Sequence, residues 1–216
     1  MAVAGQEMDQ KQAVMEKPQA APRPGGRAAR IQAAVFKAVD ELKQAGEELT
    51  VPGIAARAGV TPSTIYRRWG TLTDLLSDVA VRQLRPDGEP RDSGDWRADL
   101  KGWLEQYAEE MASDPGRAMM RDVLSSDRPE NACTCAVYTG RQLDIIRERA
   151  LARGETPPDT RTIMDRVVAP VIYRILFTHE GADGDYAAGL VEGLLGEGAP
   201  QPPACWQELS PHSLGG

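Results

Sequence analysis

Apolar residues recur every three or four positions over most of the chain, the spacing that places side chains on one face of an α-helix. Runs in which valine, isoleucine or threonine alternate with polar residues, as they do in strands, are absent. The pattern therefore predicts an all-α protein. The helices are expected over residues 28–45, 50–58, 62–69, 71–84, 95–112, 115–125, 130–152, 159–179 and 185–196.

The helix expected over residues 159–179 is apolar around most of its circumference, so it must bury more than one face. We expect one side to pack on its own domain and the other on a second subunit, beside residues 185–196. The two segments of each chain then form a four-helix interface across a two-fold axis. An internal helix in a monomer is the alternative. The residues expected in the interface are Val168, Ile172, Ile175, Leu190 and Leu194.

Both ends of the chain differ in composition from the middle. Residues 1–26 and 199–216 are rich in proline, glycine and alanine and have few large apolar side chains, so they predict a disordered arm and a flexible tail. Residues 86–94 have the composition of a linker. The linker divides the rest into a domain over 27–85 and a second domain over 93–198.

Composition narrows the class of protein. The chain has 216 residues, of which 41% are apolar, as is ordinary for a globular protein of one or two domains. It has no apolar run long enough to span a membrane and no secretory signal at its N-terminus. Three cysteines are too few for a disulfide scaffold. We expect a cytoplasmic protein with free thiols and no membrane partner.

Charge is distributed unevenly around a net value of −7. Residues 23–85 contain ten basic and six acidic residues, a net charge of +4, whereas residues 86–216 contain 13 and 23, a net charge of −10. This asymmetry favours a polyanionic partner for the first domain alone. On charge alone, a chance fluctuation explains the numbers equally well.

Residues 49–69, LTVPGIAARAGVTPSTIYRRW, predict two short helices joined by a sharp turn. Gly59 permits the positive φ that such a turn needs, and the small Ala55 lets the helices approach closely. Thr61 is a candidate N-cap, with Pro62 at the first helical position. This is the layout of a helix-turn-helix, whose second helix enters the major groove of DNA.

The second of these helices begins with small hydroxylated residues. The hydroxyls of Thr61, Ser63 and Thr64 can donate to phosphates or base edges. One helical turn separates Ser63 from Arg67, so both can lie on the groove face. The alternative is that the hydroxyls only cap the helix and that Arg67 and Arg68 are solvated. The net positive charge of the segment favours DNA binding.

The run RAARIQAAVFKAVDELKQAGEELTVPGIAARAGVTPSTIYRRWGTLTDLLSDV resembles the N-terminal domain of TetR-type transcriptional regulators over residues 28–80. The resemblance implies an N-terminal three-helix helix-turn-helix domain and a helical C-terminal domain for ligand binding and dimerisation. It also implies a homodimer, usually a repressor, that binds a palindromic operator in double-stranded DNA. By this resemblance the DNA contacts are Thr50, Thr61, Ser63, Thr64, Tyr66, Arg67 and Arg68.

Within that set, we expect Thr50 and Tyr66 to bond phosphates, and Ser63, Thr64 and Arg67 are the better candidates for base edges. One position departs from the family pattern: Leu72 stands where a lysine that reaches a phosphate is common. Its loss is expected to lower the salt slope of DNA binding by about one unit. Backbone N–H groups at this helix start can still face a phosphate. The arginines at 27 and 30 are candidates to compensate.

The second domain resembles the family's ligand-binding domain in the number and length of its helices. Its aromatic and methionine side chains suit an adaptable apolar pocket, although ordinary core packing explains them equally well. A pocket with so few charges predicts a small apolar or amphipathic effector that shifts the spacing of two DNA-binding heads. The candidate pocket residues are Trp103, Tyr107, Met111, Met119, Met120, Val123, Tyr138 and Phe177.

Other chemistry finds little support in the sequence. Cys133 and Cys135 are two positions apart and point to opposite sides of a helix, and there are only two histidines, His179 and His212, so we expect no metal site. There is no nucleophile–base pair, glycine-rich phosphate loop or spaced carboxylate pair, which predicts no enzyme and no cofactor. The alternative to a ligand-responsive regulator is a helical interaction protein that binds acidic partners without sequence-specific DNA recognition.

Overall fold

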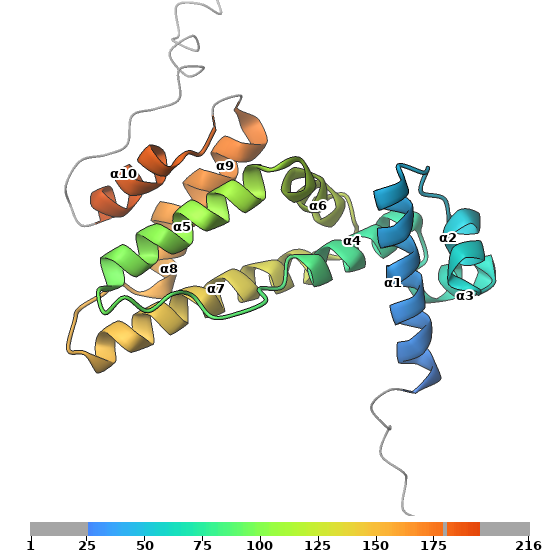
Figure 1. Cartoon of the computed structure of the whole chain (residues 1–216), viewed down its shortest axis with the longest axis horizontal. Helices are drawn as coiled ribbons and strands as arrows, with labels where there is room; N and C mark the ends of the chain where they lie inside the picture. Colours follow the sequence, from blue (N-terminus) through green and yellow to red (C-terminus); the bar gives the residue numbers. More distant parts are fainter. Residues whose placement is uncertain (1–25, 179–180, 195–216) are drawn as a thin grey trace, which may run out of the picture.

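The computed structural model describes residues 26–178 and 181–194. Every regular element in these residues is helical, which confirms the expected all-α class. The predicted arm, apart from its last residue, and the predicted tail lie outside the described residues. Figure 1 shows a small helical head that α4 joins to a larger helical body. In the described part of the chain, no helix is both long and apolar enough to cross a membrane.

The head consists of α1 (Arg27–Ala45), α2 (Val51–Ala58), α3 (Pro62–Trp69) and α4 (Leu72–Gln83). With eight residues each, α2 and α3 are too short to be stable alone. Side chains from all four helices form one buried core, so α4 completes the three-helix unit that the sequence predicts. The buried members are Val35, Phe36, Ala38, Val39, Leu42, Val51, Ile54, Ala55, Ile65, Trp69, Leu75 and Val79.

The turn between α2 and α3 has the geometry that the motif predicts. Gly59 adopts a φ of 67°, in the left-handed region, and Val60 N donates to Ala55 O at 3.0 Å. At the other end of α2, Thr50 Oγ1 accepts a hydrogen bond from Gly53 N at 3.1 Å. Both ends of α2 are thereby fixed, and the turn sets the direction in which α3 leaves it.

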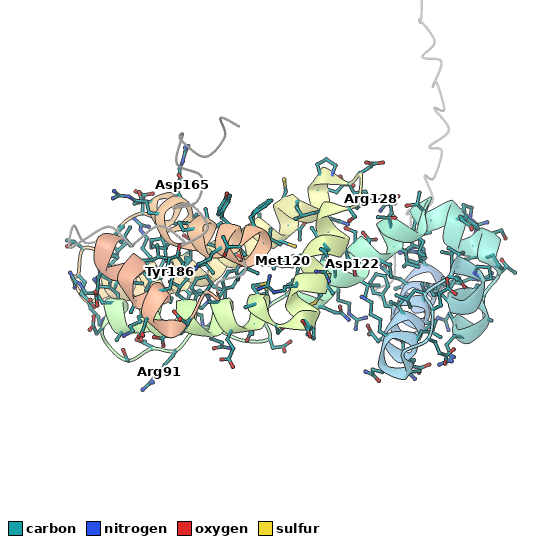
Figure 2. The ribbon with its side chains drawn as sticks, turned by 90° about the horizontal axis from the view of Figure 1, so that it is seen from above. Arg91, Met120, Asp122, Arg128, Asp165 and Tyr186 are labelled. Atoms are coloured by element: carbon teal, nitrogen blue, oxygen red, sulfur yellow. The ribbon has the colours of Figure 1, made fainter. Side chains whose placement is uncertain are left out.

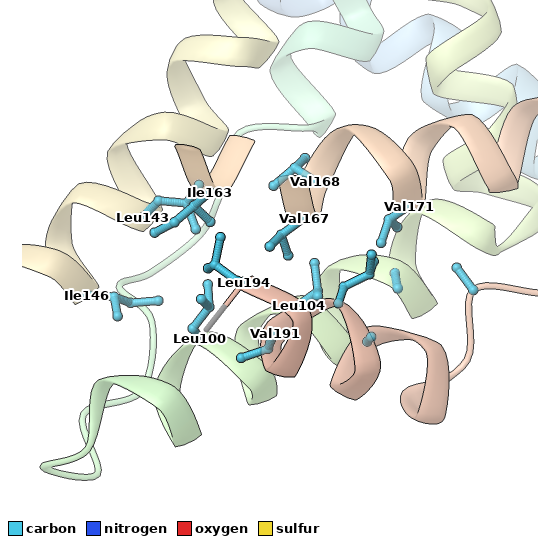
Figure 3. Packing of buried hydrophobic residues seen from close by; sticks show 14 of the residues in the cluster. Leu100, Leu104, Leu143, Ile146, Ile163, Val167, Val168, Val171, Val191 and Leu194 are labelled. Carbon is cyan, nitrogen blue, oxygen red and sulfur yellow. The ribbon is translucent and has the colours of Figure 1, made fainter. Parts of the chain in front are cut away.

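The body consists of α5 (Trp96–Ala112), α6 (Asp114–Leu124), α7 (Pro129–Ala152), α10 (Gly184–Leu194) and the helical segment 160–177. Its core forms where α5, α7, the segment and α10 face one another (Figure 3). The buried apolar side chains drawn there include Leu100, Leu104, Leu143, Ile146, Ile163, Val167, Val168, Val171, Val191 and Leu194.

The helix expected over residues 159–179 is interrupted. It comprises α8 (Thr160–Ile163), a π-helical turn (Met164–Val168) and α9 (Ala169–Phe177). Pro170 has no N–H, and its ring clashes with the carbonyl four residues earlier in a regular α-helix. The π-helical turn directly before α9 absorbs an extra residue at this point. Residues 160–177 are thus helical throughout, as the periodicity predicts, but the periodicity did not predict the π-helical turn that precedes this proline.

The connection between α4 and α5 lies alongside α7 (Figure 1). Arg149 donates to Pro90 O at 2.8 Å and to Glu89 Oε2 at 2.5 Å, and Arg153 donates to Asp92 Oδ1 at 3.0 Å. The segment predicted as a linker is therefore held along its length by two arginines. This limits how far the end of α4 can move relative to the body.

Candidate nucleic-acid interface

Helix α3 has one buried face and one exposed face. Ile65 and Trp69, one turn apart, are 0% and 1% exposed and face the head core. Ser63, Tyr66 and Arg67 are exposed. The outer face of this helix is therefore available to a partner, while its inner face fixes its position.

Three hydroxyls gather at the start of α3. Thr61 is the N-cap residue, yet its side chain makes no cap hydrogen bond. Its Oγ1 instead lies 2.9 Å from Ser63 Oγ and 3.0 Å from Thr64 Oγ1. Each hydroxyl has one donor and two acceptor sites, and the two bonds within the cluster use only some of them. The cluster can therefore still form hydrogen bonds with a phosphate or a base edge. The backbone N–H groups of the first turn favour an anion at the same end.

Tyr66 and Arg67 follow on the same helix and extend the exposed face. The Tyr66 side chain is 53% exposed. Within the part of the chain that the structure describes, neither side chain has a hydrogen-bond or ion-pair partner. A phenol and a guanidinium left free in this way can bond phosphates or base edges without breaking an existing contact.

Arg68 differs from its neighbour because it is already engaged. Its Nη1 donates to Ala28 O at 3.2 Å and its Nη2 to Gln32 Oε1 at 2.7 Å, and its guanidinium lies 5.2 Å from the centre of the Trp69 ring. The side chain thus links α3 to the first turns of α1. The geometry favours a role in holding α3 against α1 over the direct DNA contact that the resemblance implies.

The remaining predicted DNA contacts lie around α3. The Thr50 hydroxyl already accepts the cap bond of α2. Leu72 is partly buried and packs against the head core, so the residue that replaces the family's usual lysine contributes packing instead of charge. Arg27 and Arg30 are exposed in the first turns of α1.

All but one of the residues expected to line an effector pocket lie on α5, α6 and α7. Trp103 and Tyr107 are partly buried and stack with ring centroids 5.0 Å apart. Burial raises the pKa of the Tyr107 phenol, while a hydrogen bond with Thr139 opposes the shift. The phenol therefore stays neutral at physiological pH. Of the other candidates on these helices, Met111, Met120 and Val123 are buried, and Met119 and Tyr138 are partly buried.

Phe177 does not join this group. Its side chain is 71% exposed, and its ring stacks on the 45% exposed Tyr173 with centroids 5.0 Å apart. The reason is its place on the outward face of α9, one turn from Tyr173. Phe177 therefore contributes to a surface of the body and not to its interior.

The residues expected in a dimer interface also lie elsewhere than the sequence suggested. Val168, Ile175 and Leu190 are 4%, 0% and 3% exposed and belong to the core of their own chain. Leu194 is 9% exposed and Ile172 is partly buried in the same core. These side chains therefore pack inside their own chain.

The structure describes two of the cysteines, Cys133 and Cys135, and neither histidine. Cys133 is exposed and Cys135 is half-buried, and burial raises the pKa of the Cys135 thiol. His179 and His212 lie outside the described residues. Among the residues that are described, no group of three or more histidine, cysteine or acidic side chains could hold a metal ion.

Sequence reasoning missed the contacts that join the head to the body. Lys43 on α1 donates to Asp122 Oδ2 on α6 at 3.1 Å, and Asn131 on α7 donates to Ser77 Oγ on α4 at 2.8 Å. Figure 2 labels Asp122 and Arg128 where the two parts meet. The partners are 54 and 79 positions apart in sequence, so no local pattern could have paired them.

An exposed short helix with hydroxyl, phenol and guanidinium groups, held by a support helix, is the arrangement with which helix-turn-helix proteins meet DNA. The fold and this site define a helix-turn-helix DNA-binding protein with a large helical body. Two family models match the chain: bacterial regulatory proteins of the tetR family over residues 37–79, and the Tetracyclin repressor-like C-terminal domain over residues 90–194. The chain belongs to the tetR family, which makes it a DNA-binding transcriptional regulator and not an enzyme.

Individual relatives agree with this assignment. The HTH-type transcriptional regulator AqdR of Rhodococcus erythropolis is 28% identical over 134 residues, which cover 60% of this chain and 65% of that protein. The crystal structure of the TetR family regulator SCO0332 is 24% identical, covers 79% of this chain and all of that one, and has a TM-score of 0.59. A TetR regulator from Agrobacterium tumefaciens is 19% identical over 78% of this chain and 93% of its own, with a TM-score of 0.52. At these identities the solved structures support the fold.

Proposed function

We propose that this protein is a ligand-responsive repressor that binds a palindromic operator as a homodimer and is released by a small apolar or amphipathic effector. The observation that supports DNA binding most directly is the outer face of α3, where a cluster of three hydroxyls lies beside the exposed phenol of Tyr66 and the exposed guanidinium of Arg67, on a domain of net positive charge. We assign residues 27–85 to the operator and residues 93–198 to the effector and the second subunit. The repressor acts in the cytoplasm, where bacterial DNA is found.

The proposal divides the contacts on α3 by chemistry. Ser63, Thr64 and Arg67 read base edges from the first two turns, and Tyr66 bonds a phosphate. Thr61 orders the other two hydroxyls through its bonds of 2.9 and 3.0 Å. The Thr50 oxygen accepts the cap bond, and its O–H group is still able to donate a hydrogen bond to a phosphate oxygen.

Dimerisation is proposed to use the outward face of α9. Tyr173 and Phe177 form a stacked pair that remains 45% and 71% exposed, and large aromatic side chains exposed side by side are typical of interfaces. On the neighbouring α10, Gly189 and Gly193 have no side chains to keep a second helix at a distance. A two-fold axis near these helices pairs each such face with its own copy.

Effector binding is proposed at the stacked Trp103 and Tyr107 pair and the adjoining methionines. This region can act on the head because α6 packs against α4, and Lys43 pairs with Asp122 on α6 at 3.1 Å. The first turn of α6 is also tied to α9, since Arg117 donates to the carbonyl of Ile175. A shift of α6 on effector binding therefore reaches both the head and the proposed interface, which is what a change in head spacing requires.

Selection of bound duplexes from a random pool by the full chain tests the function. We expect enriched sequences with two inverted half-sites whose centres are about one helical turn or more apart. Equal binding to every duplex and to heparin, with no enrichment, would instead support the interaction protein that recognises only negative charge. An enriched site without inverted symmetry would leave DNA recognition standing and overturn the homodimer on a palindrome.

A further inference from the structure

The turn between α6 and α7 touches the recognition helix itself. Arg128, the residue before α7, donates from Nη2 to the carbonyl of Trp69, the last residue of α3, at 3.0 Å, and the same nitrogen lies 3.5 Å from the carbonyl of Arg68. The two partners are 59 positions apart and belong to the body and the head. A side chain of the effector domain is thus bonded directly to the C-terminal end of the helix that meets DNA.

This end of α3 is short of hydrogen-bond donors. The last carbonyls of a helix have no partner within it, and together they form the negative end of its dipole. After Trp69 the chain leaves the helix at Gly70, whose N–H bonds Tyr66 O at 2.8 Å and whose φ is 81°. The guanidinium of Arg128 supplies the missing donor together with a positive charge.

The same side chain also holds the start of α4. Its Nε lies 3.7 Å from Asp74 Oδ1 and its Nη1 lies 3.8 Å from Asp78 Oδ1. Two neighbours in sequence strengthen the contact: Ser126 Oγ donates to Asp74 Oδ1 at 2.7 Å, and Asn131 Nδ2 donates to Asp78 Oδ1 at 3.0 Å. The side chains of Arg128, Asp74 and Asp78 are 30%, 15% and 23% exposed, so the ion pairs are partly shielded from solvent.

The contacts of Arg128 use the planar fork of donors of its guanidinium, since Nη2, Nε and Nη1 each face a different oxygen. A guanidinium presents five N–H groups on three nitrogens in one plane, whereas the three donors of an ammonium all belong to one nitrogen and suit oxygens spread over two helices less well. Arg128 therefore fixes the angle between α3 and α4 and ties that angle to the position of the α6–α7 turn. Figure 2 shows the residue at this meeting of head and body.

We propose that Arg128 is a positioning residue for operator recognition, through which the body sets the angle at which α3 enters the groove. The inference rests on the proposed DNA-binding function. Arg128 itself makes no DNA contact: its charge is neutralised by two carboxylates of the head. A displacement of the α6–α7 turn therefore moves α3 in two ways: directly, through the bond of Arg128 to the Trp69 carbonyl, and indirectly, through the ion pairs of Arg128 with Asp74 and Asp78 on α4.

The test uses the full chain with Arg128→Ala and Arg128→Lys, and two probes: the duplex enriched by the wild-type chain and a scrambled duplex of the same length. For Arg128→Ala we expect affinity for the enriched duplex to fall about tenfold, with affinity for the scrambled duplex and the salt slope unchanged. Arg128→Lys is expected to recover only part of the loss. The charge-matched control is Arg121→Ala, an exposed residue of α6, which is expected to leave the ratio between the two duplexes unchanged.

Hydrogen exchange without DNA separates this inference from the proposed function. Arg128→Ala is expected to speed amide exchange in peptides that cover residues 66–74 while α5 and α7 keep their protection. Unchanged exchange there, or an unchanged ratio between the duplexes, would overturn the inference. A salt slope lower by about one unit would also overturn it, because it would make Arg128 a phosphate contact. If amide exchange speeds up throughout the chain in Arg128→Ala, that variant is unfolded. The exchange over residues 66–74, the ratio between the two duplexes and the salt slope are then measured on Arg128→Lys and interpreted in the same way. Failure of the wild-type chain to enrich any duplex would overturn the function alone.

Discussion

The indole Nε1 of Trp69 donates a hydrogen bond to Asp78 Oδ2 at 2.9 Å. The bond joins the last residue of α3 to the middle of α4, while the ring itself is 1% exposed and lies 6.1 Å from the ring of Phe36 on α1. One side chain thus combines core packing with a directed polar contact. The packing of Ile65 and Trp69 fixes the position of α3, and the hydrogen bond adds a direct polar link between α3 and α4.

Substitution of Trp69 separates these two contributions. Trp69→Phe keeps an aromatic ring but loses the donor, and we expect the free energy of unfolding to fall by about 1–2 kcal/mol, because Asp78 keeps its bond from Asn131. Trp69→Ala also leaves a cavity in the head core and is expected to lower the free energy of unfolding by about 3–5 kcal/mol. Urea unfolding followed by circular dichroism measures both. Equal stability of Trp69→Phe and the wild type would show that the bond contributes nothing.

Gly116 is predicted to tolerate no side chain. It lies in the first turn of α6, where an added Cβ would meet Met111 Cα at 2.8 Å and the Glu110 carbonyl oxygen at a still shorter distance. Backbone atoms of α5 cannot move away cheaply, so Gly116→Ala is expected to lower stability by about 2–3 kcal/mol. The matched control is Gly102→Ala on α5, where a Cβ meets nothing within 4 Å and stability is expected to rise by about 0.5–1 kcal/mol. Loss of stability in both variants would contradict the steric argument.

Asp74 is expected to make the head sensitive to acid. The Ser126 hydroxyl, the Thr71 hydroxyl and Arg128 hold the pKa of this carboxyl below its ordinary value of 3.8, against the opposing effect of burial. A lowered pKa in the folded state adds stability above the unfolded pKa, and this stability is lost as the pH falls through the folded value. In Asp74→Asn we therefore expect a smaller decline in unfolding free energy below about pH 4.

Urea titrations at a series of pH values test this expectation. The charge-matched control is Asp87→Asn, which replaces an exposed carboxyl of the connection between α4 and α5. The control is expected to follow the wild-type acid decline. An identical decline in Asp74→Asn would show that this carboxyl does not contribute.

The helices of the head and the turn between α2 and α3 could be predicted from the sequence. Its elements are set by local chemistry: Thr50 and Thr71 cap α2 and α4, and Gly59 takes the positive φ of the turn. Ile65 and Trp69 are buried one turn apart, as their spacing predicts. The helix expected over residues 71–84 is present as α4, and its Leu75 and Val79 belong to the same core.

The body could be predicted only as a set of helices. Periodicity finds an apolar stripe but not what the stripe packs against, so Ile175 and Leu190 looked equally suited to a partner and to their own core. The same limit applies to Phe177, whose exposed position depends on the direction in which α9 turns. The sequence suggests a DNA contact or a solvated charge for Arg68 and assigns no role to Arg128. Their bonds to Ala28 and Trp69 cross 40 and 59 positions and exist only once the helices are assembled.

The proposed subunit interface predicts that Phe177→Glu yields a monomer. A buried carboxylate in each of two symmetric faces costs more than an interface gains from aromatic packing, and the two charges face each other near the axis. Light scattering after size exclusion is expected to give the chain mass of 23.4 kDa for the variant and twice that for the wild type. The control is Leu151→Glu, which adds the same charge to a 47% exposed position at the end of α7. Dimers in both variants would exclude this face of α9.

Substitution of the adjacent arginines Arg67 and Arg68 is predicted to affect different properties: operator affinity for Arg67 and stability for Arg68. Arg67 has no partner among the described residues, so Arg67→Ala is expected to leave the free energy of unfolding within about 0.5 kcal/mol of the wild type. The same change lowers operator affinity by about tenfold or more if Arg67 bonds a base. Arg68→Ala removes the bonds to Ala28 O and Gln32 and the contact with the Trp69 ring, so it is expected to cost about 1 kcal/mol of stability. Urea unfolding and duplex binding on both variants measure the difference. A loss of specific affinity in Arg68→Ala with unchanged stability would restore Arg68 to the set of direct DNA contacts.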